Sequence, residues 1–153
     1  MNCRIAILAA SLAVASAAPA MATAPAVATL SSSKAGARHV TLTISITAEL
    51  QCGRLMGSRT LAVTLPARIA TSVPASAVTV GGKAVRAVSV AGRAVTVTLA
   101  PPRGIMCDSI RTGVAKLVFL PAANVVNPAS PGSYAVRVAH GSQSYSAPLA
   151  IHA

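Results

Sequence analysis

The segment from Val78 to Leu99 constrains the fold more than any other part of the chain. Apolar and polar residues alternate in three short runs, and the breaks between the runs fall at Gly81-Gly82 and at Ala91-Gly92-Arg93. A period of two places one set of side chains on a buried sheet face and the other in water. Glycine at a break permits the positive φ that a tight hairpin turn requires. The segment therefore predicts a β-meander, with an inner face on its last run formed by Val95, Val97 and Leu99.

The same alternation recurs along the rest of the chain. It is longest from His39 to Thr47, where Val40, Leu42, Ile44 and Ile46 are predicted to point inward. One Phe, two Tyr and no Trp leave aliphatic side chains to fill the core, and β-branched residues suit strands. No helical period lasts long enough to build a crossover helix. We predict an all-β, antiparallel sandwich of about seven to eight short strands, and a barrel satisfies the same pattern. Further strands are expected at 60–65, 114–120, 133–139 and 143–151, the last as an edge strand because of Pro148.

The N-terminus has the pattern of a signal peptide. Arg4 supplies a positive start, Ile5 to Ala15 is apolar, and Ala20-Met21-Ala22 fits the small-x-small cleavage pattern. An uncleaved anchor is the alternative, although alanine-rich segments are weakly hydrophobic for a span. No later run is long and apolar enough to cross a bilayer. The expected organisation is a signal peptide over residues 1–22, a flexible leader rich in Ala, Ser, Pro and Gly over 23–38, and one β-sandwich domain over 39–153.

Two cysteines remain once the signal peptide is removed. An even pair in an exported chain predicts a disulfide, here between Cys52 and Cys107. Closing the loop between them would stabilise the fold by roughly 4 kcal/mol on the chain-entropy model. Two free buried thiols are the alternative.

The charge of the chain predicts anionic partners. The formal net charge is +11, and removal of Arg4 would leave twelve Lys and Arg against Glu49 and Asp108. Such a surplus attracts nucleic acids, acidic glycans, envelope phosphates and membrane surfaces, unless it reflects compositional bias alone. The arginines form no run and few aromatic side chains accompany them, so specific nucleic-acid recognition is not expected. A patch for anionic ligands is possible at the disulfide loops, formed by Arg54, Arg59, Arg103 and Arg111.

Catalytic and metal chemistry have little support in the sequence. Glu49 and Asp108 are the only acidic residues, so a carboxylate pair is not expected. The three histidines, His39, His140 and His152, lack a nucleophile-elbow context and lie far from each other in sequence. Cysteines and histidines are too dispersed for zinc, and the carboxylates are too few for calcium. We therefore predict a protein that is not an enzyme, with no metal and no cofactor.

Four sequence features carry a resemblance to a known group. They are Leu65-Pro66 at a strand end, Ser76 to Val80 leading into a glycine turn, Val95 to Leu99 closing in Pro101, and Val126-Asn127-Pro128 followed by Gly132 to Val136. With these features the chain resembles the immunoglobulin-like β-sandwich modules of bacterial surface and secreted proteins, over residues 60–138. The chain departs from the usual pattern in having Gly81-Gly82 where Asn-Gly is more typical, and in its positive charge. The resemblance implies a spacer, an adhesion unit or a wall-associated part.

Together these observations predict a non-enzymatic structural or interaction module that is secreted, periplasmic or held at the cell envelope. It would present a basic β-sandwich surface to envelope proteins. The alternative is a charge-driven binder of anionic envelope polymers or glycans, acting through the basic disulfide-loop end.

Overall fold

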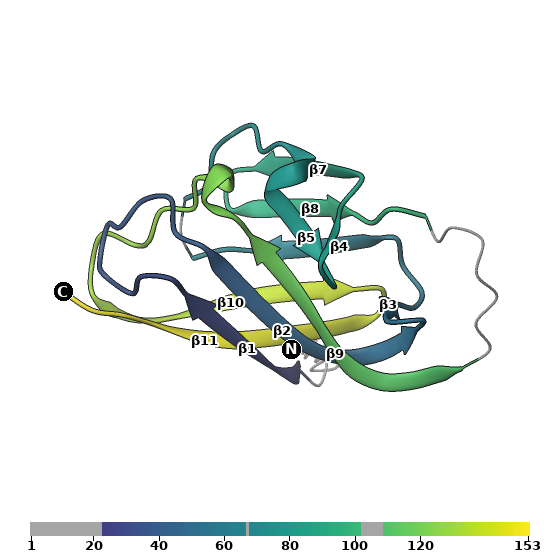
Figure 1. Ribbon diagram of the computed structural model, residues 1–153. Helices are drawn as coiled ribbons and strands as arrows, with labels where there is room; N and C mark the ends of the chain where they lie inside the picture. Colours follow the sequence, from purple (N-terminus) through teal and green to yellow (C-terminus); the bar gives the residue numbers. More distant parts are fainter. Residues whose placement is uncertain (1–22, 67, 102–108) are drawn as a thin grey trace, which may run out of the picture.

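The computed structural model describes residues 23–66, 68–101 and 109–153 (Figure 1). The predicted signal peptide over residues 1–22 lies outside this part of the chain. The described residues form strands joined by turns and two short 3-10 helices, so the prediction of an all-β protein is confirmed. The strands are β1 (Thr23–Leu30), β2 (Leu42–Gln51), β3 (Arg54–Leu55), β4 (Thr60–Thr64), β5 (Val78–Val80), β6 (Lys83–Ala84), β7 (Ala87–Ala91), β8 (Ala94–Thr98), β9 (Ile110–Phe119), β10 (Gly132–His140) and β11 (Gln143–Ile151), and the helices are η1 (Ala75–Ala77) and η2 (Pro121–Ala123).

One continuous sheet contains all eleven strands. Ten of them follow the order β6-β5-β9-β2-β1-β11-β10-β4-β8-β7, and β3 pairs beside this path with β2. The sheet curls into a half-barrel, so that β2, β5 and β9 lie on one side and β4, β8, β10 and β11 on the other (Figure 1). Both sides contribute to a single hydrophobic core. The expected count of seven to eight strands is too low because the sequence did not signal β1, β3 and β6 as separate strands.

The sheet is mixed, so the expectation of a purely antiparallel one is wrong. β1 and β11 run parallel, with Thr23 to Pro25 beside Ser144 to Ser146. The remaining pairs, including β1 with β2, are antiparallel. The alternation pattern was compatible with a sandwich and with a barrel, and the half-barrel is intermediate between these two architectures. The immunoglobulin-like sandwich stays a prediction.

The segment expected to be a flexible leader is instead part of the fold. Residues 26–30 pair with β2, while residues 23–25 pair with β11, so β1 connects the two sides of the sheet. Ala24, Ala26, Ala28 and Leu30 pack against the core. Pairing with β2 and β11 gives β1 backbone hydrogen bonds and burial, which its alanine-rich composition alone does not predict.

The chain between β1 and β2 is also fixed by hydrogen bonds. The buried Asn127 side chain donates from Nδ2 to the carbonyl oxygens of Ser32 and Lys34, both at 2.8 Å. The Ala35 N–H donates to the carbonyl oxygen of His152, and the Gly36 N–H to that of Pro128. Asn127 therefore holds the second half of the expected leader against the C-terminal end of the sheet.

The segment predicted to be a meander is divided between the two sides of the sheet. β5 and β6 form a hairpin around Gly81-Gly82, and β7 and β8 form another around Gly92-Arg93, as the glycines indicated. The two hairpins do not pair with each other, because β5 pairs with β9 and β8 pairs with β4. The chain crosses between the sides at Val85, whose side chain is buried. The prediction of one meander is wrong, although its turns are correct.

Alternation predicted the core face of most strands correctly. In β2 and β4 the inward residues Leu42, Ile44, Ile46, Leu61 and Val63 are buried, and the intervening polar residues are not. Val95 and Val97 are buried as expected, whereas Leu99 is half-buried at the end of its strand. Aliphatic side chains dominate the core, with Tyr145 and Phe119 as its largest fully buried members.

Two further expectations need correction. The disulfide loops were expected at residues 49–58 and 103–112, but residues 49–51 and 110–112 extend β2 and β9, which pair as far as Gln51 and Ile110. β11 is not an edge strand, because it lies between β1 and β10. Pro148 has no N–H to donate. It is tolerated because β1 pairs with β11 only up to Ser146, and from Ala26 onward β1 pairs with β2 instead.

Candidate functional site

The end of β2 brings together the residues expected to bind anions. β3 and β9 flank β2 at this end, with Arg54 in register with Gln51 and Arg111 in register with Leu50. Two strand spacings separate the backbones of Arg54 and Arg111, which is about 10 Å. Arg111 is exposed, and Arg54 is half-buried because its Nη1 donates to the carbonyl oxygen of Pro101 at 3.2 Å.

Arg59 approaches the same end from the other side of the sheet. It precedes β4 and is exposed, and its carbonyl oxygen accepts a hydrogen bond from the Leu99 N–H at 2.8 Å. Leu99 and the Pro101 that Arg54 contacts belong to the segment that follows β8, so Arg54 and Arg59 lie around one stretch of chain. Arg111 lies at the start of β9, two strands from Arg54 and in register with Leu50. We call Arg54, Arg59 and Arg111 the basic end. Arg103, the fourth predicted member, lies outside the described residues.

The predicted disulfide is only half within the described part of the chain. Cys52 occupies the turn between β2 and β3, with a positive φ of 52°. Cys107 lies outside the described residues, so the bond stays a prediction. The pairing of Gln51 with Ile110 brings the turn at Cys52 close to the first residue of β9.

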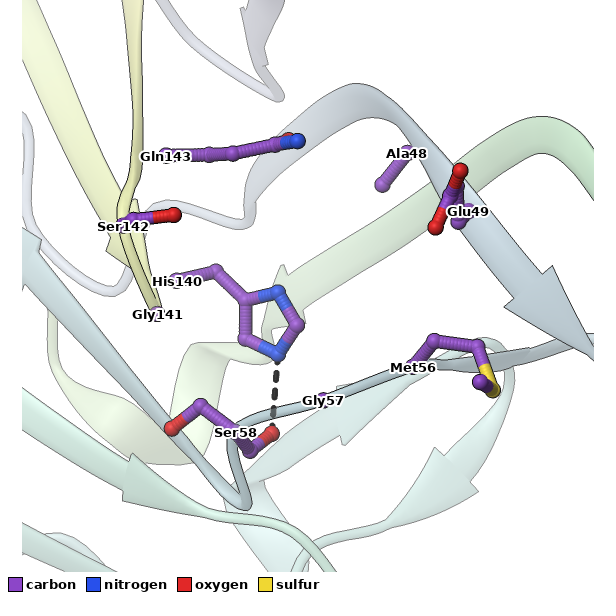
Figure 2. Close-up of a pocket in the computed structure, with 9 residues that line it drawn as sticks. All are labelled: Ala48, Glu49, Met56, Gly57, Ser58, His140, Gly141, Ser142 and Gln143. Atoms are coloured by element: carbon purple, nitrogen blue, oxygen red, sulfur yellow. Dashed lines mark hydrogen bonds between the residues drawn. The ribbon is translucent and has the colours of Figure 1, made fainter.

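A hollow of about 160 Å³ lies next to the basic end, where the β10–β11 turn faces the end of β2 (Figure 2). The imidazole of His140 forms its inner wall and is 7% exposed. His140 Nε2 donates to the carbonyl oxygen of Ser58 at 2.8 Å, since a carbonyl oxygen only accepts. Nδ1 lies on the opposite side of the ring, toward the interior of the hollow (Figure 2). The other lining residues are Ala48, Glu49, Met56, Gly57, Gly141, Ser142 and Gln143.

The lining of the hollow consists of hydrogen-bonding groups and a few apolar ones. Its ionisable side chains are one imidazole and one exposed carboxylate, from His140 and Glu49. Within the described ranges, no group of three or more His, Cys, Asp or Glu side chains could hold a metal ion. The residues that line the hollow can therefore donate hydrogen bonds to a small polar group and accept hydrogen bonds from it.

Sequence reasoning placed His140 in a hairpin turn and missed its burial. His140 is the last residue of β10 and continues the inward series of Val136 and Val138 by the same period of two. That period was the available signal. The other two histidines are exposed, and they lie beyond the far ends of strands that line the hollow, since His39 precedes β2 and His152 follows β11.

A buried tyrosine, Tyr145, is hydrogen-bonded to a residue that lines the hollow. The Tyr145 hydroxyl donates to Oε1 of Gln143 through a short hydrogen bond, and Gln143 lines the hollow. Burial raises the pKa of Tyr145 above its ordinary value of 10.0, because the phenolate loses hydration in the core. The hydroxyl therefore stays protonated and keeps donating to Gln143 across the neutral range.

Comparison with known proteins identifies a neighbour for the fold. No protein-family model matches the chain, and no curated protein matches it by sequence. Among solved structures, the chain is similar to the crystal structure of BslA, described as a bacterial hydrophobin. The TM-score is 0.51 at 19% sequence identity, and the match covers 85% of this chain and 98% of the BslA chain. The likeness shows that the two chains share an all-β architecture.

Proposed function

We propose that this protein is a non-enzymatic, extracytoplasmic structural or interaction module that presents a basic β-sheet surface at the cell envelope. The observation that carries the proposal is where its charge lies. Eleven of the thirteen Lys and Arg residues are in the described part of the chain, and ten of these eleven are exposed. Glu49 is the one carboxylate side chain among the described residues. This cationic surplus therefore faces solvent without enough carboxylates to neutralise it.

Exposed apolar side chains support a role in interaction. Val27, Val114 and Ile110 are 61%, 58% and 53% exposed. They lie on the outward face of β1 and β9, where their register partners on β2 are Ser45, Thr47 and Gln51. Apolar residues gathered on one exposed face commonly mark a contact surface. The description of BslA as a bacterial hydrophobin agrees with a non-catalytic role for this architecture.

Export through a signal peptide at residues 1–22 is part of the same proposal. Among the helices that the structure describes, none is long and apolar enough to cross a membrane.

The convergence of Arg54, Arg59 and Arg111 favours a second candidate function, which is binding of anionic polymers through the basic end. Arg54 and Arg59 both lie at residues 99–101, and Arg111 lies two strands from Arg54, so a linear polyanion following this end of the sheet could contact all three. Affinity of this kind falls steeply as salt screens the charges.

One experiment separates the two candidates. The chain is bound to an insoluble cell-envelope fraction and to resin coated with dextran sulfate, and is eluted by a salt gradient. A variant carrying Arg54→Gln, Arg59→Gln and Arg111→Gln is compared with a matched control carrying Arg38→Gln, Arg68→Gln and Arg93→Gln, in which exposed arginines elsewhere lose the same total charge.

If the basic end binds polyanions, its variant should elute from both matrices at lower salt than the control. Equal shifts for the two variants would show that only overall charge matters, which favours the basic surface as a whole. Retention on the envelope fraction that persists at high salt would indicate a specific protein or glycan partner. A chain that fails to bind the envelope fraction at low salt would contradict the proposed location.

A further inference from the structure

β7 leaves one edge of the sheet open. The strand order ends at β6 on one side and at β7 on the other. β6 is only two residues long and contains Lys83, features that protect an edge from pairing with another chain. β7 is five residues long, Ala-Val-Ser-Val-Ala, and has no charged residue. Within the described ranges, β8 is the only strand that pairs with β7.

The turn after β7 determines which backbone groups face outward. Gly92 and Arg93 form a two-residue turn between Ala91 and Ala94, with a φ of 63° at Gly92. The residue pair that closes such a turn is hydrogen-bonded, and hydrogen-bonded pairs then alternate along the ladder. The N–H and C=O groups of Ala87, Ser89 and Ala91 therefore face β8. Those of Val88 and Val90 point away from the sheet.

The sequence of β7 is the same read in either direction. An antiparallel pairing of two copies about a two-fold axis at Ser89 would place Ala87 opposite Ala91 of the partner and Val88 opposite Val90 of the partner. The outward groups of Val88 and Val90 are in the positions that make hydrogen-bonded pairs in this register, which gives four backbone hydrogen bonds across the axis. Sequence and backbone geometry thus select the same register.

We propose that β7 is a self-pairing edge through which two copies of this chain join their sheets. Val88 and Val90 pack against the core while remaining half-exposed, because β8 is the only described strand beside β7. In the pair, the same two valines of the partner would cover them and continue the inner face of the sheet. Each outward surface of β7 would meet only small side chains, from Ala87, Ser89 and Ala91.

Two arginines limit the strength of the contact. Arg86 precedes β7 and Arg93 follows it, and both are exposed. Antiparallel pairing brings Arg86 of one copy next to Arg93 of the other at each end, where the like charges repel. Salt screens this repulsion, so self-association should strengthen as salt is added. This dependence is opposite to that expected for binding to a polyanion.

The small size of the contact also predicts weak association. A stable interface normally involves some 20 to 30 residues on each side, whereas this edge has five. We expect a dimer that forms at high local concentration and dissociates on dilution.

A cysteine at the two-fold axis tests the register. Ser89 would face its own copy in a non-hydrogen-bonded pair, where Cα atoms lie about 4.5 Å apart, within the range that a disulfide spans. Ala87→Cys is the matched control, because Ala87 is on the same outward face of the same strand. Ala87 and its copy would be about 14 Å apart along the strands, too far for a disulfide.

Both variants of the full chain are oxidised under mild conditions, and the crosslinked peptide is identified by mass spectrometry. We expect Ser89→Cys to form the symmetric 89–89 crosslink roughly ten times faster than Ala87→Cys forms its own. Equal rates for the two variants would overturn the proposed register.

A charge exchange at the same position tests association without crosslinking. Ser89→Lys and Ser89→Glu should each remain monomeric at concentrations where the unaltered chain dimerises, because like charges would meet at the axis. An equimolar mixture should recover the dimer, as measured by sedimentation velocity in 0.15 M salt, where the Debye length of about 8 Å exceeds the separation at the axis. An unaltered chain that stays monomeric at millimolar concentration, or a mixture that fails to recover association, would refute self-pairing through β7.

Discussion

Tyr145 contributes to two parts of the molecule at once. Its ring is one of the two largest fully buried side chains, and its hydroxyl reaches Gln143 at the border of the hollow. Placing a hydroxyl in the core is tolerated because the Gln143 oxygen accepts its proton in a hydrogen bond. Ionisation of the same hydroxyl would leave a phenolate without hydration, which is why its pKa is raised.

This raised pKa predicts a loss of stability at alkaline pH. The unfolded chain releases the Tyr145 proton near pH 10, whereas the folded chain releases it at higher pH. The contribution to the free energy of unfolding is therefore fully present below about pH 10 and is lost as the pH rises from there through the folded pKa. Tyr145→Phe should lower stability at pH 7 by about 1 kcal/mol through the lost hydrogen bond, and should flatten the decline above pH 10.

Urea unfolding at pH 7, 9 and 10.5 would measure this difference. Tyr134→Phe is the control, since Tyr134 is half-buried and donates to the backbone oxygen of Ser130. Parallel stability curves for Tyr145→Phe and the unaltered chain would show that Tyr145 does not cause the alkaline loss.

β1 determines how the strands are arranged as a single sheet. It pairs with β2 through residues 26–30 and with β11 through residues 23–25, so it is the connection between the two sides. Its inward side chains, which are mostly alanine, pack against the core that both sides share.

A pair of substitutions in β1 distinguishes a strand from a flexible leader. Ala28 is in register with Ile44 and packs against the core, whereas Val27 is 61% exposed on the outward face. Ala28→Asp should lower the free energy of unfolding by about 2 kcal/mol, since it places a carboxylate against apolar side chains. Val27→Asp should change it by less than about 0.5 kcal/mol. Chemical denaturation of the two variants would measure both values, and equal, negligible effects would mean that β1 is not packed in solution.

Strand identity was predictable where large apolar residues alternate with polar ones, as in β2, β4 and β10. β1 also alternates, with Ala24, Ala26, Ala28 and Leu30 inward, but alanine is found at both exposed and buried positions and Pro25 disfavours a strand. Glycines indicated the turns of the segment 78–99 correctly. They could not indicate that its two hairpins separate, because strand partners distant in sequence are chosen by packing of the whole core.

The basic end was predicted from the sequence, whereas the hollow beside it was not. Proximity of Arg54 and Arg111 was inferred from cysteines expected to join their loops, and the pairing of β2 with β3 and β9 brings the two residues together independently. The hollow was missed because its lining comes from three segments, around Glu49, Ser58 and His140. No local pattern in the sequence relates those segments to one another.

At the scale of the whole molecule, charge and hydrogen-bonding capacity are unevenly placed. The basic end and the hollow lie together where β2 meets the β10–β11 turn, while the self-pairing edge lies at the end of the strand order. A polyanion that engaged the basic end of many copies would also raise their local concentration and favour pairing through β7.

The predicted disulfide would fix the basic end to this arrangement. For a chain beginning at Thr23, native Cys52 and Cys107 should both resist a thiol reagent. Cys52→Ser should expose one reactive thiol and lower stability by roughly 4 kcal/mol. Thiol titration with thermal unfolding would measure both effects, and a double Cys52→Ser, Cys107→Ser variant serves as the control without thiols. Two reactive thiols in the unaltered native protein would exclude the bond.

The parallel pairing of β1 with β11 also sets the order in which the molecule can be completed. β1 is the first described strand to be synthesised and β11 is the last, so Thr23 cannot reach Ser144 until nearly the whole chain is available. Contacts between such distant positions make folding slow. If the chain is exported, it would pass through the membrane before β1 finds its final partner, and delayed folding would keep it competent for translocation. The pairing of β1 with β11 would then delay completion of the fold until the chain has crossed the membrane.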